Sequence, residues 1–408
     1  MHVELGYETG VPVGNPCSIR RTCRLCTHRV EESQPRSSLV FIHIIWNKNS
    51  PNFPPGPLPF PFLGNVFTGA EKYGNVFSLT RGCTKIVYVS GYKMVKESFV
   101  IQGESFAFCV LPLFDEIYKG RGLSFTSGYS WKKHQQFAIS YFKNFGEKRE
   151  TLQHKIQQEC YFLCEAFKEE QGCPFDPLIK INNAVANVIG TLVFGHRYKY
   201  DDIQFQKLLR MITESVYLTG SVWNERRNDK EGQFNTDNLE WCMVDLFDGL
   251  TNTLRWALLY MIKYPQIQAM ADKANMPYTN AVLHEVQRKG DIVPLNMAKV
   301  ATKDTTGHGG NQTLEGTIMI TNLSSVLHDK NEWETTDTFN SEHFLDSEGH
   351  FHRRDAFLPF SAGKRMCPGE YLARVELFLL FTCHLQKFTF HRPPGEEPSM
   401  DSQLGFTK

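Results

Sequence analysis

The chain has 408 residues, enough to bury a large core, and its 41% hydrophobic, 13% aromatic and 22% charged residues are typical of a globular protein. Its 44 basic residues balance 44 acidic ones, so no long-range field of one sign marks it as a nucleic-acid binder. The number of cysteines, 11, is odd, and they are scattered through apolar runs, as at Cys160, Cys164, Cys242 and Cys383. This pattern favours reduced cysteines over a disulfide framework.

Residues 1–50 mix Arg, Cys, Ser and Gly without periodicity, and we expect an irregular segment there. Half of a zinc-site spacing is present in this segment, at Cys17, Cys23, Cys26 and His28. One alternative is therefore a zinc or interaction protein built on these residues. The longest apolar stretch of the segment, residues 39–46, is shorter than the roughly 20 residues that a membrane span needs.

A proline-rich stretch at residues 51–59 marks the start of the folded body, because prolines at that density hold a chain extended and stiff. We expect residues 51–408 to form a single domain. Between Val76 and Val89, two short β-rich runs flank Arg81-Gly82-Cys83. This arrangement predicts a hairpin and a small sheet near the N-terminal side.

Amphipathic helices are expected after the hairpin. One apolar stripe recurs every three or four residues and ends before Gly172, with the members Leu152, Ile156, Cys160, Leu163 and Phe167. A second stripe consists of Val185, Val188, Ile189, Leu192 and Val193.

A long helix is expected from Leu239 to Tyr264, with Asp237 and Glu240 placed as a capping box and Pro265 as the stop. Its second half, residues 254–261, is apolar nearly all round and should lie buried at the centre. Before this helix, the hydrophilic stretch between Trp223 and Asp237 predicts a solvated loop. The sequence as a whole predicts a mainly α fold with a minor β-sheet region.

The chemically informative stretch runs from Phe360 to Gly369 and delivers Cys367 to the N-terminus of an apolar helix. The helix dipole and free backbone N–H groups favour a thiolate at such a position, and a thiolate can ligate a metal. Gly363 permits a tight turn, and Gly369 lets a flat ligand approach the helix. Phe360 can cover the sulfur, and Arg365 can pair with a carboxylate of the ligand. A buried structural cysteine is the alternative for a lone Cys, but here five spaced positions match at once.

The pattern Phe-x-x-Gly-x-Arg-x-Cys-x-Gly resembles the haem-ligand signature of the cytochromes P450. The resemblance implies the cytochrome P450 fold and haem b as cofactor. It also implies that Cys367 is the axial thiolate, Arg365 a propionate partner and Phe360 the residue that shields the Fe–S bond. A haem thiolate pushes electron density toward dioxygen and favours O–O cleavage.

A second motif places Glu285 and Arg288 on one face of an expected helix, where the two charges can pair. Alone, Glu-x-x-Arg indicates a solvated salt bridge. In this chain it resembles the family's buried Glu-x-x-Arg pair, which locks the core beneath the haem. Residues 337–344 resemble the meander that packs on this pair, with Ser341 in the place of the family's usual proline.

Further matches run from about residue 50 to the end and include residues 131–137, 254–260 and 276–280. They are similar to family 2 of the vertebrate microsomal P450s, above all to the branch that oxidises fatty acids such as arachidonate. Trp131 matches a haem-propionate donor, although the Arg that normally lies four residues later is Gln135. Lys299 occupies the site of a second basic propionate partner.

The central helix departs from the family, which has an Ala-Gly-x-Glu-Thr-Thr turn whose acid and hydroxyl deliver protons to oxygen. The segment in this chain, Asp245-Leu-Phe-Asp-Gly-Leu-Thr-Asn-Thr253, is about one turn shorter. Losing one turn nearly preserves the helix face, so Asp248 with Thr251, or Thr253, can act as the catalytic substitute. Equally, Asp248 can be a satisfied polar residue with no catalytic part.

Three other departures concern the distal side and the two ends. The loop after Trp223 replaces several helices that roof the substrate pocket in the family, so we expect parts of the distal roof to be missing. Residues 1–50 stand in place of the family's membrane helix, and residence at the cytoplasmic face of the endoplasmic reticulum membrane is implied by the resemblance alone. The chain ends at Lys408, before the family's last C-terminal hairpin.

The resemblance implies a monooxygenase that inserts one oxygen atom of O2 into a lipophilic substrate, either a fatty acid such as arachidonate or a xenobiotic. Its electrons would come from NADPH through NADPH-cytochrome P450 reductase, with cytochrome b5 as a second candidate partner. A basic patch for an acidic reductase can be formed by Lys132, Lys133, Lys143 and Lys364, although surface lysines are more often plain solvation. The main rival is a truncated haem-binding chain without monooxygenase turnover.

Overall fold

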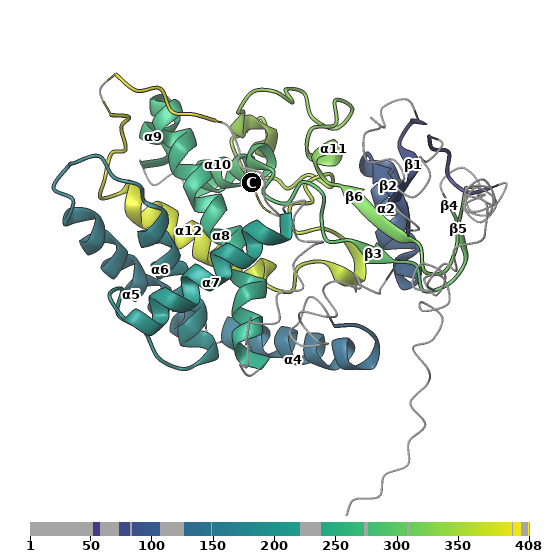
Figure 1. Cartoon of the computed structure of the whole chain (residues 1–408). Helices are drawn as coiled ribbons and strands as arrows, with labels where there is room; N and C mark the ends of the chain where they lie inside the picture. The colour runs from purple at the N-terminus through teal and green to yellow at the C-terminus, as the bar shows by residue number, and fades with distance from the viewer. Residues whose placement is uncertain are drawn as a thin grey trace, which may run out of the picture.

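The structure is a computed structural model, and it describes residues 52–57, 73–81, 84–106, 126–147, 149–220, 238–272, 276–307, 311–393, 395–400 and 407. The candidate zinc residues of the N-terminal segment and the loop between Trp223 and Asp237 lie outside these ranges. Most of the longer helices lie on one side of the molecule, and the strands lie on the other together with α2 (Figure 1). The predicted mainly α fold with a minor sheet is confirmed.

The predicted hairpin is present as β1 (Val76–Arg81) and β2 (Thr84–Ser90), which pair in antiparallel register with Arg81 opposite Thr84. The sheet then continues through distant segments of the chain. β2 pairs in parallel with β6 (Ile318–Asn322), and β6 pairs antiparallel with β3 (Lys299–Val300). A separate two-stranded sheet contains β4 (Thr305–Gly307) and β5 (Asn311–Thr313).

A short helical run packs on this sheet. It consists of α2 (Tyr92–Lys96), the π-helical turn η3 (Glu97–Ile101) and the 3-10 turn η4 (Gly103–Phe106). Val87 and Val89 of β2 are fully buried beneath this run, and Val95 and Phe99 of the run itself are buried with them. This small core holds η3 in place, and η3 in turn contacts the cysteine loop described below.

Helices occupy much of the remaining described chain. In order, its helices are α4 (Gly128–Glu147), α5 (Arg149–Lys168), α6 (Leu178–Val193), α7 (Ile203–Gly220), α8 (Asn238–Lys263), α9 (Pro265–Asp272), α10 (Met276–Gly290), α11 (Ser324–Leu327) and α12 (Glu370–Leu385). Two further 3-10 turns are η6 (Ser341–Phe344) and η7 (Gly363–Arg365).

The two apolar stripes read from the sequence form the buried faces of α5 and α6. Every member of the α5 stripe is at most 6% exposed, and Gly172 follows that helix with φ at +82°. In α6, Val185 is fully buried whereas Val193, in the last turn, is only partly buried. The periodicity argument therefore located both helices correctly.

Helix α8 is the predicted central helix, and it contacts α6, α10 and α12. Ala257 and Met261 are fully buried, although Arg255 reaches solvent. Pro265 follows the end of α8, and it is also the first residue of α9, where its fixed φ and missing N–H are tolerated. The proposed capping box remains a prediction, because Asp237 and the side chain of Glu240 lie outside the described parts.

Among the helices that the structure describes, none combines the length and the apolar character needed to cross a bilayer.

Helix α12 buries the carboxyl group of Glu376 away from water and from hydrogen-bond donors of the described chain. Glu376 is 0% exposed, and within the described chain neither of its carboxyl oxygens has a hydrogen-bond partner. Burial, reinforced by the nearby carboxylate of Glu159, raises the pKa of Glu376 well above its ordinary value of 4.5. Folding therefore retains a proton that the unfolded chain loses, and the free energy of unfolding falls as the pH rises above about 4.5.

Replacing Glu376 by Gln is therefore expected to raise the free energy of unfolding at pH 7 by about 1–3 kcal/mol. Each tenfold preference for the protonated form is worth about 1.4 kcal/mol, and Gln has no proton to retain. Denaturant titrations at several pH values should show that the gain shrinks toward zero below the unfolded pKa. Glu169→Gln, at an exposed position just after α5, is the control and should change nothing. A pH-independent loss of stability in Glu376→Gln would contradict the argument.

Candidate functional site

The cysteine motif forms a tight loop that leads into α12. Cys367 carries a reduced, half-buried thiol two residues before Gly369, the N-cap of this 16-residue helix. The backbone N–H of Cys367 donates to the carbonyl of Phe360 at 2.9 Å, which closes the loop. The thiol therefore lies at a helix N-terminus, where the dipole favours an anion, as the sequence predicted.

Gly363 is required by the backbone at its position. Its φ is +75°, and a Cβ there would lie 1.8 Å from the carbonyl oxygen of Phe99 in η3. No side chain fits between the loop and η3, so the predicted tight turn at Gly363 is confirmed. Gly369 has φ at −89°, which other residues adopt easily, and its expected role in admitting a flat ligand stays a prediction.

Arg365 and Trp131 lie together, although 234 positions separate them in the printed sequence. The guanidinium of Arg365 lies 3.8 Å from the centroid of the Trp131 ring, and Trp131 is only 4% exposed on α4. The same guanidinium donates to the carbonyl of Thr126 at 2.7 Å and to the hydroxyl of Ser127 at 3.2 Å. Two of the predicted anion-binding groups therefore share one place beside the cysteine loop.

Gln135, which replaces the Arg of the family pattern, has a different use. Its side-chain amide donates to the carbonyl of Lys364 at 2.9 Å. Because Lys364 belongs to η7, this bond ties α4 to the cysteine loop.

Lys299 is buried beside the same loop. The residue is 1% exposed, its ammonium lies 3.5 Å from the centroid of the Phe99 ring, and it lies 3.5 Å from the hydroxyl of Ser361. Ser361 has a left-handed φ of +66° and also accepts from the amide of Asn296 at 2.9 Å. The ammonium is therefore buried beside the cysteine loop, where its positive charge suits a negatively charged ligand.

The start of α12 is fixed by contacts of Arg374 that were not predicted from the sequence. Arg374 donates to Glu370 at 2.9 Å and to Nε2 of His284 at 2.6 Å. Burial lowers the pKa of His284 to about 3, so the ring is neutral and its Nε2 accepts while Nδ1 donates to the carbonyl of Asn280. The guanidinium also lies 5.2 Å from the centroid of the Phe360 ring. Only the four-residue spacing of Glu370 and Arg374 was visible in the sequence.

The structure distinguishes between the two candidate hydroxyls on α8. Thr253 donates to the carbonyl of Gly249 at 2.6 Å, so its hydroxyl is occupied by its own helix. Thr251 is 1% exposed, and its hydroxyl has no hydrogen-bond partner among the described residues. The side chain of Asp248 lies outside the described part of the chain, and its role stays a prediction.

The predicted pairing of Glu285 with Arg288 on α10 is confirmed, and both side chains are 0% exposed. Arg288 donates two parallel hydrogen bonds of 2.7 Å to the Glu285 carboxylate. The meander closes over the pair, because the N–H of Asn340 donates to Glu285 at 2.9 Å and His343 lies 3.1 Å from its other oxygen. Arg288 also donates to the carbonyl of Leu327 at 2.9 Å, so the pair locks this part of the core.

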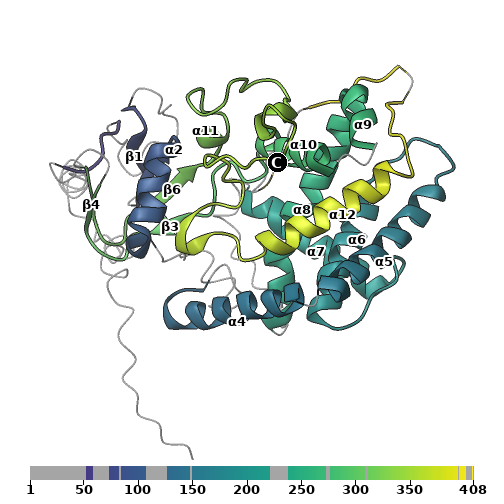
Figure 2. The same ribbon diagram turned by 180° about the vertical axis from the view of Figure 1, so that it is seen from behind.

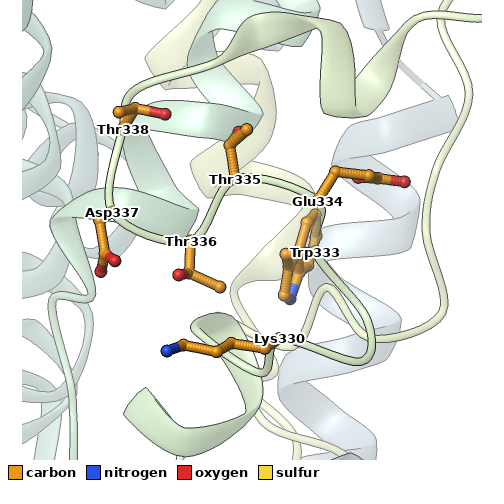
Figure 3. A pocket seen from close by; sticks show the side chains of 7 residues that line it. All are labelled: Lys330, Trp333, Glu334, Thr335, Thr336, Asp337 and Thr338. Atoms are coloured by element: carbon orange, nitrogen blue, oxygen red, sulfur yellow. The ribbon is translucent and has the colours of Figure 1, made fainter.

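A surface pocket opens at the meander (Figure 3), lined by Lys330, Trp333, Glu334, Thr335, Thr336, Asp337 and Thr338. Arg288 approaches the backbone carbonyls of three of these residues from the core side. None of the lining residues belongs to the cysteine loop, α4 or α8, so this pocket is not where the candidate cofactor residues meet.

The residues around Cys367 fit a haem. In the chain as described, no group of three or more His, Cys, Asp or Glu side chains is arranged to hold a metal ion. Cys367 could supply one thiolate ligand to an iron held by a cofactor such as haem. Arg365, Trp131 and Lys299 offer donors or positive charge to anionic groups of that cofactor.

The Cytochrome P450 family matches this chain over residues 54–226 and 215–408. Because the match covers most of the chain, the chain belongs to the cytochrome P450 family, whose members are haem-containing monooxygenases. Its relatives include human cytochrome P450 2J2, 37% identical over 87% of this chain and 89% of the relative. Mouse cytochrome P450 2J5 is 36% identical over 90% and 91% of the two chains. Cytochrome P450 2D20 of Mesocricetus auratus is 34% identical over 86% and 89%.

The comparisons also show that this chain is shorter than a relative within the part that is aligned. The alignment with the human relative spans 449 positions, more than the 408 residues of this chain, so it opens gaps within this chain. The family match breaks into two segments that meet at residues 215–226. This overlap ends beside the loop after Trp223, where the absence of distal roof helices stays a prediction.

Proposed function

We propose that this chain is a haem-thiolate monooxygenase in which Cys367 ligates the iron of haem b and the substrate is a lipophilic molecule such as a fatty acid. The observation that carries the proposal is the convergence of Arg365, Trp131 and Lys299 on one loop that presents a thiol at a helix N-terminus. When bound, the haem would supply the activation of dioxygen.

The chain's own residues would divide the remaining tasks. Arg365 and Trp131 would bind one propionate and Lys299 the other, because each places a donor or a positive charge beside the loop. The backbone carbonyl of Phe360, which accepts from the N–H of Cys367, would fix the loop. The Phe360 ring would keep water from the sulfur. Gly363 and Gly369 would allow the loop and the flat ligand to approach closely.

Thr251 would hold or pass the proton that oxygen needs as it is reduced. Its buried hydroxyl has the unused hydrogen-bonding capacity that this task requires, whereas the Thr253 hydroxyl is already bound to Gly249. Asp248, three residues before Thr251 on the same helix, would supply the acid. We therefore assign proton delivery to Thr251 with Asp248 rather than to Thr253.

Electrons would come from NADPH through NADPH-cytochrome P450 reductase, with cytochrome b5 as a second donor, at the cytoplasmic face of the endoplasmic reticulum membrane. Lys132 and Lys133 are exposed on α4 and could meet an acidic partner. Lys364 is exposed too, but it pairs with Glu104 of its own chain, so part of its charge is already neutralised. The side chain of Lys143 lies outside the described chain.

The experiment compares two ways of driving oxidation of a fatty-acid probe. Hydrogen peroxide brings oxygen that already carries its electrons and protons, so it does not need the hydroxyl of the shortened helix. We expect product to be detected more readily with peroxide than with NADPH and reductase. Thr251→Ala should lower only the reductase-driven yield, by about a hundredfold or more.

Thr253→Ala is the matched control, because it removes a buried hydroxyl from the same helix that is already bound to a backbone carbonyl. It should leave both routes unchanged. Efficient NADPH turnover that is indifferent to both Thr251→Ala and Asp248→Ala would overturn the assignment. Haem binding without product by either route would show a chain that binds the cofactor without turnover.

A further inference from the structure

A hydrogen bond joins the cysteine loop to the segment between α10 and β3. The side-chain amide of Asn296 donates to the hydroxyl of Ser361 at 2.9 Å. Ser361 follows Phe360 in the cysteine loop, and Asn296 shortly precedes Lys299 of β3. Seen from behind, β3 lies beside the loop that leads into α12 (Figure 2). The bond therefore connects the loop that carries Cys367 with the segment that carries Lys299.

The orientation of the Asn296 amide follows from a second contact of the same side chain. Its Oδ1 accepts from the backbone N–H of Met297 at 2.8 Å, so its NH2 group is the end that faces Ser361. The backbone N–H of Asn296 donates to the carbonyl of Val293 at 3.2 Å. Main chain and side chain of Asn296 are thus both held, and the donor stays directed at Ser361.

The backbone conformation distinguishes the same two residues. Among the residues that the structure describes, four other than glycine have a positive φ, and two of them are Asn296, at +53°, and Ser361, at +66°. This conformation is unfavourable for most L-residues, although asparagine adopts it more easily than serine does. It persists where the surrounding contacts hold it, and such residues cluster at functional sites. One hydrogen bond therefore joins two residues that both occupy an unfavourable conformation.

The Ser361 oxygen also contacts the ammonium of Lys299, at 3.5 Å. The amide of Asn296 and this ammonium therefore approach one oxygen, which has two lone pairs to accept them. Lys299 is 1% exposed, and its ammonium lies 3.5 Å from the centroid of the Phe99 ring. A displacement of the Ser361 hydroxyl would thus move the buried positive charge that Lys299 offers to a ligand.

Strand pairing fixes the main chain of β3 but not the ammonium. β3 pairs with β6, and Lys299 lies opposite Met319. The ammonium ends a flexible stem of four carbons, so the strand alone leaves its position open. The contact with Ser361 is made at the ammonium itself. Asn296 therefore acts on the position of the charge rather than on the strand.

We propose that Asn296 is a positioning residue for the cofactor. Its amide holds the Ser361 hydroxyl, and through that oxygen it fixes the Lys299 ammonium where an anionic group of the haem binds. The inference rests on the proposed function, because it takes haem as the ligand and Lys299 as a propionate partner. In this role Asn296 acts through Ser361 and Lys299 and not on the reacting atoms.

The test measures two properties of the full haem-loaded chain: the rate at which haem passes to an excess of apomyoglobin, and the reduction potential of the haem. Asn296→Gly and Ser361→Gly remove the bond from its two ends, and glycine adds no strain at a positive φ. Either change should speed haem loss about threefold to tenfold, which is the effect of one hydrogen bond. Either should also lower the reduction potential, because a displaced ammonium stabilises the reduced haem less.

A double-mutant cycle with Lys299→Met separates the positioning role from a general loosening of the loop. Lys299→Met alone should lower the reduction potential by more than Asn296→Gly does. In the Lys299→Met background, Asn296→Gly should lower the potential no further, because the charge that it positions is gone. Asn331→Ala is the control, since it removes an exposed amide that binds Asp329, and it should change neither measurement.

Two results would overturn the positioning role while leaving the proposed function intact. Asn296→Gly could leave haem loss and reduction potential at their wild-type values, or it could lower the potential equally with and without Lys299. In both cases the wild-type chain would still show the spectrum of a thiolate-bound haem. A wild-type chain without that spectrum would overturn the proposed function, and this inference with it.

Discussion

Glu285→Ala is expected to prevent the accumulation of haem-loaded protein, because it leaves the fully buried guanidinium of Arg288 without its counter-ion. Breaking a buried pair by removing one partner costs about 3–5 kcal/mol. That is a large part of the 5–15 kcal/mol by which proteins are typically stable. The cost should lie at the high end, because the same carboxylate also binds Asn340 and His343 of the meander.

The measurement is the yield of soluble protein and its haem content per chain after expression under identical conditions. Glu334→Ala is a matched control, because this carboxylate also pairs with an arginine, Arg354, but is 63% exposed. An exposed pair is worth about 0–1 kcal/mol, so the control should express and bind haem like the wild type. Normal yield and haem content in Glu285→Ala would mean that the pair is not buried in solution.

The parts of the site that follow from local backbone chemistry could be predicted from the sequence. The φ of Gly363, the start of α12 after Cys367 and the shared helix face of Glu285 and Arg288 each depend on a few neighbouring residues. The same holds for the hairpin around Arg81 and for the apolar stripes of α5 and α6, because side-chain period alone fixes which face is buried.

Contacts between distant segments could not be predicted in this way. Nothing local to Arg374 indicates that it binds His284, 90 residues away, or that the buried His284 stays neutral. The sequence also left both Thr251 and Thr253 as candidates, and the bond from Thr253 to Gly249 now separates them.

Cys367→Ser is expected to remove the spectroscopic signature of a thiolate-bound haem. A hydroxyl at the same helix N-terminus remains protonated at neutral pH and does not replace a thiolate as a ligand. The change is close to isosteric, and Cys367 is only half-buried, so the folded chain should persist. Circular dichroism and the tryptic pattern of the variant should match those of the wild type, which separates loss of the ligand from loss of the fold.

A second control concerns the N-terminal cysteines. The triple change of Cys17→Ser, Cys23→Ser and Cys26→Ser removes the half-set of zinc-type ligands and should leave the iron content unchanged. Loss of haem in that variant would mean that the N-terminal segment takes part in the site.

The most direct test of Cys367 as the axial ligand is the absorption spectrum of the reduced protein under carbon monoxide. We predict the red-shifted Soret band of a thiolate-ligated haem in the wild type and its disappearance in Cys367→Ser. A wild-type spectrum that matches a histidine-ligated haem, or a red-shifted band that survives in Cys367→Ser, would contradict the assignment.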